Sequence, residues 1–314
     1  LRVFYKDLPQ AQRQVLWSRK YWVDMLGDSP RLVKVLLAMG ILTAGFVVSS
    51  YDETPVTSRS RLLFKSQAFM RDLAAEVEDA LFDHYGEHVV PESSPVAAGV
   101  AETLNRLVAA VDAHPTLGPR RAALGLNFRL VVIEDEEPKM FTVPSGTVFV
   151  FTGILDTVTD KDAFACMMGH EMVHALLEHR REELSKKGVV GALSALAYTL
   201  GFATGPTLPA AGMLAVATDK SVEKLLPPAY RRDLEREADV VGLMIAARAC
   251  FDPRAAPSEW ARLAALYPED RYGFQRLSML TDSHPSHEHR VEALQAMMRF
   301  ALLEREDCNC APLD

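Results

Sequence analysis

The sequence predicts an α+β fold that is mainly helical, with a separate apolar helix ahead of the main domain. Three observations indicate this class. Long stretches such as 62–85 and 96–113 have apolar residues that recur at helical spacing. Residues 128–155 instead hold the short apolar and alternating runs that are typical of strands and of a hairpin. The charge-free segment 35–48 precedes both kinds of element.

Composition excludes several classes of protein. Hydrophobic residues make up 49% and charged residues 24% of the chain, so it is neither disordered nor membrane-embedded over its whole length. The net charge of −8, with no long basic run, argues against a nucleic-acid partner. Four cysteines are too few for a disulfide scaffold, and their spacing is not that of a CxxC zinc site.

The N-terminal part divides at the apolar segment. Residues 32–51 are predicted to form a transmembrane helix, since they approach the roughly 20 apolar residues that a span needs. Gly40, Gly45 and aromatic residues shortly before the segment favour a membrane. A mild excess of basic residues then places 1–31 on the inner side and 52–314 on the outer side of a lipid bilayer. A buried helix remains the alternative, because the charge-free run itself is short.

The main domain begins with elements that follow one another in a clear order. Helices are assigned from apolar residues at helical spacing, and strands from short apolar runs bounded by turn residues. The expected elements are a helix over Leu62–Tyr85, a loop at 89–95, a second helix at 96–113, a strand over Phe128–Asp135, and a hairpin over Met140–Leu155 that turns at Pro144, Ser145 and Gly146.

Two further helices and one ambiguous stretch complete the domain. Thr159 can cap a helix that carries the sequence GHEMVH, and Tyr230–Ala249 is a later helix. Between them, residues 189–217 are almost free of charge but are interrupted by glycines and prolines. That stretch is either a helical hairpin that covers the core or a membrane-contacting lid beside the site, and both interpretations stay open.

The HEMVH sequence predicts a zinc site. On a helix, His170 and His174 are four residues apart, so both imidazoles leave the same face one turn apart and can reach one ion. Glu171 lies beside them, where it can take a proton from a water molecule at the metal. The apolar residues around the motif argue against the alternative of incidental histidines on a surface helix.

A catalytic zinc ion needs a third protein ligand and one open position. The helix at Tyr230–Ala249 offers Glu235 as that ligand and Asp239, four residues later, as a partner for a ligating imidazole. Ala238 and Gly242 are small enough to let this helix approach the first closely. The spacing alone leaves open that Glu235 belongs to a solvated run of charges, and Glu237 points elsewhere on the helix.

Five stretches together resemble the Oma-type family of mitochondrial inner-membrane zinc metalloendopeptidases, relatives of the CAAX prenyl protease and of bacterial membrane heat-shock metallopeptidases. The resemblance implies a gluzincin-like domain with Glu235 as the third ligand and Asp239 beside a ligating histidine. It also implies an N-terminal matrix segment, a single span and a catalytic domain that faces the intermembrane space. The five stretches are HEMVHALLEH, RDLEREADVVG, VPSGTVFVFTGIL, SHPSHEHRVEAL and REDCNCAPL.

Other residues of the predicted site rest on the resemblance as well. In relatives a His-Pro pair and a downstream arginine lie beside the zinc ion, which makes His284 and Arg290 candidates for stabilising the oxyanion. His179 is expected to support a ligand or to pack. Cys250 is expected to pair with one of the two last cysteines, Cys308 or Cys310, and the sequence does not choose between them.

The sequence therefore predicts a membrane-anchored endopeptidase with one catalytic Zn²⁺. Its substrates would be inner-membrane proteins, such as the dynamin-like fusion GTPase cleaved under mitochondrial stress, bound as an extended strand near Phe149. A bacterial-envelope or prenyl-protein peptidase is one alternative. A zinc-stabilised chaperone or scaffold without turnover is another, although a structural site needs no base such as Glu171. The oligomeric state, including a homo-oligomer, stays open.

Overall fold

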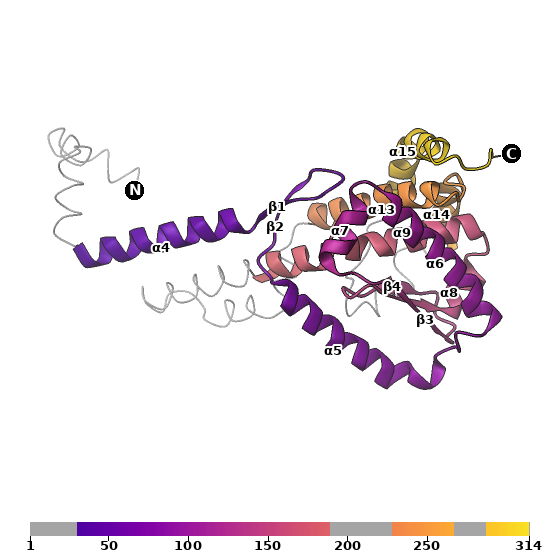
Figure 1. Ribbon diagram of the computed structural model, residues 1–314, viewed down its shortest axis with the longest axis horizontal. Coiled ribbons are helices and arrows are strands. Elements are labelled where there is room, and N and C mark those ends of the chain that lie inside the picture. Colours follow the sequence, from indigo (N-terminus) through magenta and orange to yellow (C-terminus); the bar gives the residue numbers. More distant parts are fainter. Residues whose placement is uncertain (1–29, 189–227, 267–286, 314) are drawn as a thin grey trace. The chain divides into compact units, whose positions relative to one another are not determined.

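The computed structural model describes residues 30–188, 228–266 and 287–313. It consists of two compact units, Leu1–Tyr51 and Asp52–Asp314. Two features of the sequence prediction, the charge-poor stretch 189–217 and the candidate residue His284, lie outside the described residues. The second unit is mainly helical with small sheets, which confirms the α+β class (Figure 1).

The apolar N-terminal segment forms helix α4, Pro30–Ser49. The helical conformation expected for most of 32–51 is therefore confirmed. Among the described residues, however, no helix is apolar over a length that suffices to cross a membrane, which differs from the transmembrane helix that the sequence predicted for 32–51.

The stretch that follows contains a small sheet that the sequence did not predict. Strands β1, Tyr51–Glu53, and β2, Ser60–Leu62, pair with each other. Helix α5 covers Gln67–Tyr85 and begins five residues later than expected. Ser66 sets that start, because its side chain accepts a hydrogen bond of 3.1 Å from the backbone N–H of Phe69.

Two helices then lead to the main sheet. Helix α6, Pro95–Ala113, confirms the predicted second helix and is capped by Ser94, which accepts from the backbone N–H of Ala97. Helix α7, Leu117–Leu124, was not predicted and ends at Gly125, whose φ of 62° is left-handed. Both helices pack on a later helix, α9 (Lys161–Leu176), so they form one wall of the core.

The main sheet has three strands in the order β3-β5-β4. Strand β3, Arg129–Ile133, runs parallel to β5, Thr147–Phe151, and β4, Met140–Thr142, is antiparallel to β5. The β4–β5 hairpin turns as expected at Gly146, whose φ of 100° suits glycine. The end of the predicted hairpin is instead helix α8, Thr152–Thr157.

The strand order corrects one prediction. Phe149 was expected on the edge strand where a substrate would lie, but it belongs to β5, the central strand, and its side chain is fully buried opposite Phe141. Among the described residues, the edge of the sheet on the hairpin side is β4. The error arose because β3 pairs with β5 from outside the hairpin, and this long-range pairing leaves no local signal.

The two helices that carry the predicted ligands cross with their backbones in contact. Helix α9 covers Lys161–Leu176 and is capped by Asp160 rather than by Thr159. Helix α13 covers Pro228–Arg248 and packs against α9. A Cβ atom added to Gly242 would lie 2.5 Å from the backbone nitrogen of His170, so only glycine fits this crossing.

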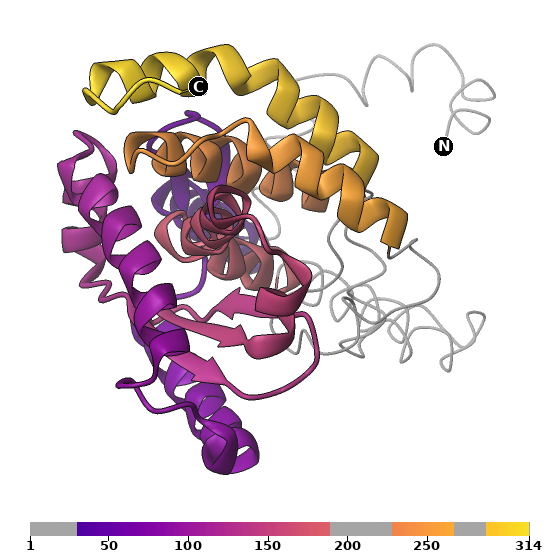
Figure 2. The same cartoon turned by 90° about the vertical axis from the view of Figure 1, so that its right-hand side faces the viewer.

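Two more helices and a disulfide bond complete the C-terminal part of the domain. Helices α14, Ala255–Leu266, and α15, His287–Asp307, pack against each other, and α15 also packs on α13 (Figure 2). Cys250, just after α13, is bonded to Cys310, with a Cα–Cα distance of 5.3 Å, while Cys308 is free. The structure thus selects Cys310 from the two partners that the sequence had left open.

The helix crossing predicts a reversal of the usual glycine effect. Gly→Ala inside a helix ordinarily stabilises by roughly 0.5–1 kcal/mol. Gly242→Ala should instead lower the free energy of unfolding by about 1–3 kcal/mol, because its methyl group overlaps the backbone of α9. Gly99→Ala, in an open position of α6, is the matched control and should be neutral or stabilising. Denaturant unfolding measures both, and equal effects would contradict the proposed contact.

The disulfide predicts a redox-dependent stability. The bridge joins residues 60 positions apart, and loops of this size typically gain about 2–4 kcal/mol from cross-linking. Cys250→Ser, or reduction of the wild type, should lower the melting temperature and alter function while leaving the metal ligands in place. Cys308→Ser is the control and should melt like the wild type. Peptide mapping without reductant checks the bridge itself, and a free Cys250 thiol in oxidised protein would disprove it.

Candidate metal centre

Three side chains from two helices converge at the crossing of α9 and α13. His170 and His174 are one turn apart on α9, and their Nε2 atoms are 3.0 Å apart. Glu235 of α13 places Oε2 3.4 Å from Nε2 of His170 and Oε1 3.6 Å from Nε2 of His174. One nitrogen or oxygen from each residue therefore faces a common point.

The donor set and its spacing fit zinc. Imidazole nitrogens and a carboxylate oxygen are ordinary zinc ligands, and tetrahedral bonds of about 2.0–2.1 Å would separate such atoms by roughly 3.3 Å. The three ligand atoms all lie within 4.8 Å of one another, with the closest pairs near that separation. Three protein ligands also leave one tetrahedral position open, as a catalytic site requires.

His170 is held from behind by a buried ion pair. Its Nδ1 lies 2.9 Å from Oδ1 of Asp239, and Arg290 of α15 donates to Asp239 from Nε at 3.0 Å and from Nη2 at 2.5 Å. The ring of Trp260 covers the guanidinium, with Cζ 3.6 Å from the ring centroid. Because Nδ1 of His170 is directed at a carboxylate, Nε2 is turned toward the metal position.

The charges around His170 favour a cation there. Burial and the positive Arg290 lower the pKa of His170, but the hydrogen bond and charge of Asp239, together with a hydrogen bond to Glu235, outweigh them and raise it to about 9. Burial raises the pKa of Asp239, but Arg290 and His170 lower it by a larger amount, so the net shift is downward. A pocket that stabilises a proton on His170 also stabilises a metal ion that replaces that proton.

His174 has a different set of outer partners. Its Nδ1 lies 2.9 Å from Nδ1 of His179, and Nε2 of His179 lies 3.2 Å from Oε2 of Glu237. Burial raises the pKa of Glu237, but hydrogen bonds from His179, Thr57 and Arg59 hold it well below the usual range of a carboxyl group. Glu237 is therefore a buried carboxylate that reaches the candidate ligand His174 through His179.

Glu171 lies on the metal side of the helix between the two histidines. Its side chain is buried, and its Oε1 is 3.9 Å from Nε2 of His170. A carboxylate at this place can exchange a proton with a molecule bound in the open position. The structure thus places Glu171 beside the two histidines, and its role as the base and theirs as ligands remain predictions.

An open cleft reaches the metal centre from the side of the sheet. Its walls include Thr142 of the edge strand β4 and also His174 and Glu235. Most of the exposed wall area is apolar, although charged side chains such as Arg181 and Glu183 also line it, so the cleft can accept an apolar side chain next to an extended backbone. The apolar residues that line it are Met70, Leu124, Leu126, Pro144, Ala175 and Leu234.

The structure brings together most of the residues that the sequence singled out. Arg290 lies against Asp239 and His170, so it supports the carboxylate that orients the candidate ligand His170. The oxyanion role expected for Arg290 remains a prediction. Sequence reasoning missed Glu237 and Arg59 because their roles depend on contacts between distant segments. The gathered residues are His170, Glu171, His174, His179, Glu235, Asp239 and Arg290.

Comparison with known proteins agrees with this arrangement. The chain is 31% identical over its whole length to the mitochondrial metalloendopeptidase OMA1 of Bos taurus and 32% identical to that of Danio rerio. It covers 57% and 63% of those proteins, so it spans about three fifths of their length. The protein of the same name in Schizosaccharomyces pombe is 28% identical, and the chain covers 86% of it.

The profile of peptidase family M48 matches residues 97–298, which include both ligand-bearing helices and Arg290. The match covers well over half of the chain and contains His170, His174 and Glu235, the three residues that converge in the structure. The chain therefore belongs to peptidase family M48.

Proposed function

We propose that the chain is a zinc-dependent metalloendopeptidase. The convergence of His170, His174 and Glu235, with Glu171 on the same side, carries the proposal. Membership of peptidase family M48 and the similarity to mitochondrial metalloendopeptidases support it. A scaffold without turnover would have no need of a carboxylate base beside a site with an open position.

The chemistry divides between the ion and the side chains. When bound, a zinc ion would polarise the peptide carbonyl and make a water molecule more acidic. Glu171 accepts the proton of the attacking water and passes it to the leaving amine. Asp239 and Arg290 keep His170 oriented, and the apolar walls of the cleft limit the access of bulk water.

The substrate is proposed to bind as an extended strand along β4. This strand lies at the edge of the sheet, and its Thr142 lines the same cleft as His174 and Glu235. Backbone hydrogen bonds to such an edge hold a peptide independently of its sequence, and the apolar cleft adds selectivity. We propose mitochondrial membrane proteins as the substrate class, including the dynamin-like fusion GTPase under stress.

The proposed location is the mitochondrion, which the names of the similar proteins from animals and yeasts support. The more detailed arrangement expected from the sequence, an inner-membrane protein whose catalytic domain faces the intermembrane space, stays a prediction. Immunogold labelling or protease protection of isolated mitochondria tests both levels.

The role of Glu171 gives the direct test of function. Glu171→Gln should retain bound zinc but lose more than about 100-fold of the cleavage rate on an unfolded casein, because the amide cannot accept a proton. Metal analysis and cleavage are measured on the same preparation. Activity within tenfold of the wild type would remove Glu171 from the role of base, and a wild type without zinc and without cleavage would refute the proposed function.

The ligand role of Glu235 is tested separately through metal content. Glu235→Gln should lose zinc, since it removes the charge of the only carboxylate among the three ligands. Asp233→Asn is the matched control, because Asp233 lies on the same helix but pairs with Arg236 at the surface. Equal zinc contents in the two variants, after dialysis against a chelator of moderate affinity, would show that Glu235 is not a ligand.

A further inference from the structure

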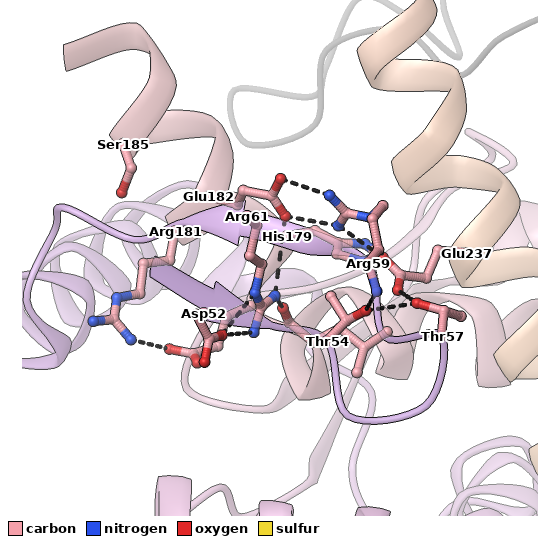
Figure 3. Close-up of polar contacts among 12 residues, drawn as sticks. Asp52, Thr54, Thr57, Arg59, Arg61, His179, Arg181, Glu182, Ser185 and Glu237 are labelled. Carbon is pink, nitrogen blue, oxygen red and sulfur yellow. Dashed lines mark hydrogen bonds and ion pairs between the residues drawn. The ribbon is translucent and has the colours of Figure 1, made fainter. Parts of the chain in front are cut away.

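Arg59, in the turn between β1 and β2, binds two buried carboxylates of the main domain. Arg59 donates from Nη1 and Nη2 to the two carboxylate oxygens of Glu182, both at 2.7 Å. It also donates from Nε at 3.0 Å and from Nη2 at 2.8 Å to Oε2 of Glu237 (Figure 3). The side chains of Glu182 and Glu237 are 0% and 3% exposed, so Arg59 joins two buried anions, and Glu182 also faces Lys186 at 3.7 Å and Arg61 at 4.0 Å.

The loop that presents Arg59 is itself fixed. The backbone N–H of Arg59 donates to Oγ1 of Thr54 at 3.0 Å, and Oγ1 of Thr54 lies 2.6 Å from that of Thr57. The Thr57 hydroxyl in turn donates to Oε1 of Glu237. The carboxylate of Glu237 thus has partners on both of its oxygens, supplied by the hairpin and by His179.

The hydrogen bonds from the candidate ligand His174 through His179 to Glu237 can all point the same way, from donor to acceptor. If His174 presents Nε2 to the metal, its Nδ1 carries the hydrogen and donates to Nδ1 of His179, 2.9 Å away. The hydrogen of His179 is then on Nε2, which donates to Oε2 of Glu237 at 3.2 Å. A carboxylate at the end of the chain therefore selects the tautomer of both imidazoles.

We propose that Arg59, Glu237 and His179 form a positioning relay that holds His174 with Nε2 toward the metal. The relay rests on the proposed zinc site. It gives His174 what Asp239 and Arg290 give His170, namely a carboxylate that fixes the ring and an arginine that fixes the carboxylate. The support reaches His174 from a segment more than 100 residues earlier in the chain, outside the part that matches the family profile.

A substitution at Glu182 can distinguish the positioning of His174 from a general contribution to stability. Glu182 shares Arg59 with Glu237, and its side chain is fully buried, but among the described residues it bonds neither His174 nor His179. Glu182→Gln and Glu237→Gln therefore damage the same ion cluster, and only the second interrupts the path to the ligand. A purely structural role predicts that the two variants behave alike.

The experiment compares zinc affinity by chelator competition in the wild type, Glu237→Gln, Arg59→Gln and Glu182→Gln. Loss of an outer-shell partner typically weakens metal binding about 10–100-fold, and we expect this for Glu237→Gln and at least several-fold weakening for Arg59→Gln. Glu182→Gln should stay within about twofold of the wild type, although its metal-free melting temperature falls. The absorption spectrum of the Co²⁺-substituted proteins should change only in the first two variants.

A second pair of variants covers the case in which the buried ion cluster fails to fold. His179→Asn can still place an acceptor near Nδ1 of His174, whereas His179→Leu cannot, so zinc affinity should be higher in the first. The relay would be overturned by equal zinc affinities in this pair. It would also be overturned if Glu237→Gln or Arg59→Gln bound zinc as tightly as the wild type, or if Glu182→Gln lost as much zinc affinity as Glu237→Gln. A wild type that binds no zinc would refute the proposed function instead, and these failures are distinct.

Discussion

The contact between Gly169 and Gly242 determines how the rest of the site is built. A ligand set shared by two helices requires that their axes approach closely, and here the backbones themselves touch. The contact lies directly next to His170, and Glu235 and Asp239 are two and one turns before Gly242 on the other helix. Any side chain at the crossing would separate the carboxylates from the imidazoles. The apolar packing around it therefore serves to press two helices together at a single point.

The close approach of the two helices buries several carboxylates, and other elements of the domain supply the positive charges that neutralise them. Glu235, Glu237 and Asp239 place three carboxylates on five consecutive residues of a largely buried helix segment. Uncompensated burial of such charges costs far more than a fold of this size can supply. One arginine arrives from α15 and another from the β1–β2 hairpin, and each binds a carboxylate that contacts a histidine. Elements from both ends of the domain are thus required by charges at its centre.

The sequence predicted those parts of the site that depend on helix geometry. The spacing of His170, Glu171 and His174 and that of Glu235 and Asp239 define faces of two helices, and small residues such as Gly242 indicated their approach. The partners of Arg59 were not predictable, since "DETPVTSRSR" resembles an ordinary polar turn and its contacts are more than 100 residues away. Phe149 was misplaced for the same reason, because strand order depends on pairing with β3. Likewise, the local turn at the C-terminus, where Asn309 has a φ of 55°, brings Cys310 rather than Cys308 to Cys250.

Helix α13 is attached to the rest of the domain near its middle, where Arg59 binds Glu237, and just past its end, where Cys250 is bonded to Cys310. The family profile, which spans 97–298, contains all three candidate ligands but neither Arg59 nor Cys310. A recombinant fragment cut to those limits would lose Arg59 and Cys310 and with them both attachments. Boundaries drawn from sequence similarity mark what relatives have in common, whereas an autonomous folding unit is marked by where its internal charges and bonds are satisfied. For this protein that unit begins in the β1–β2 hairpin and extends to Cys310.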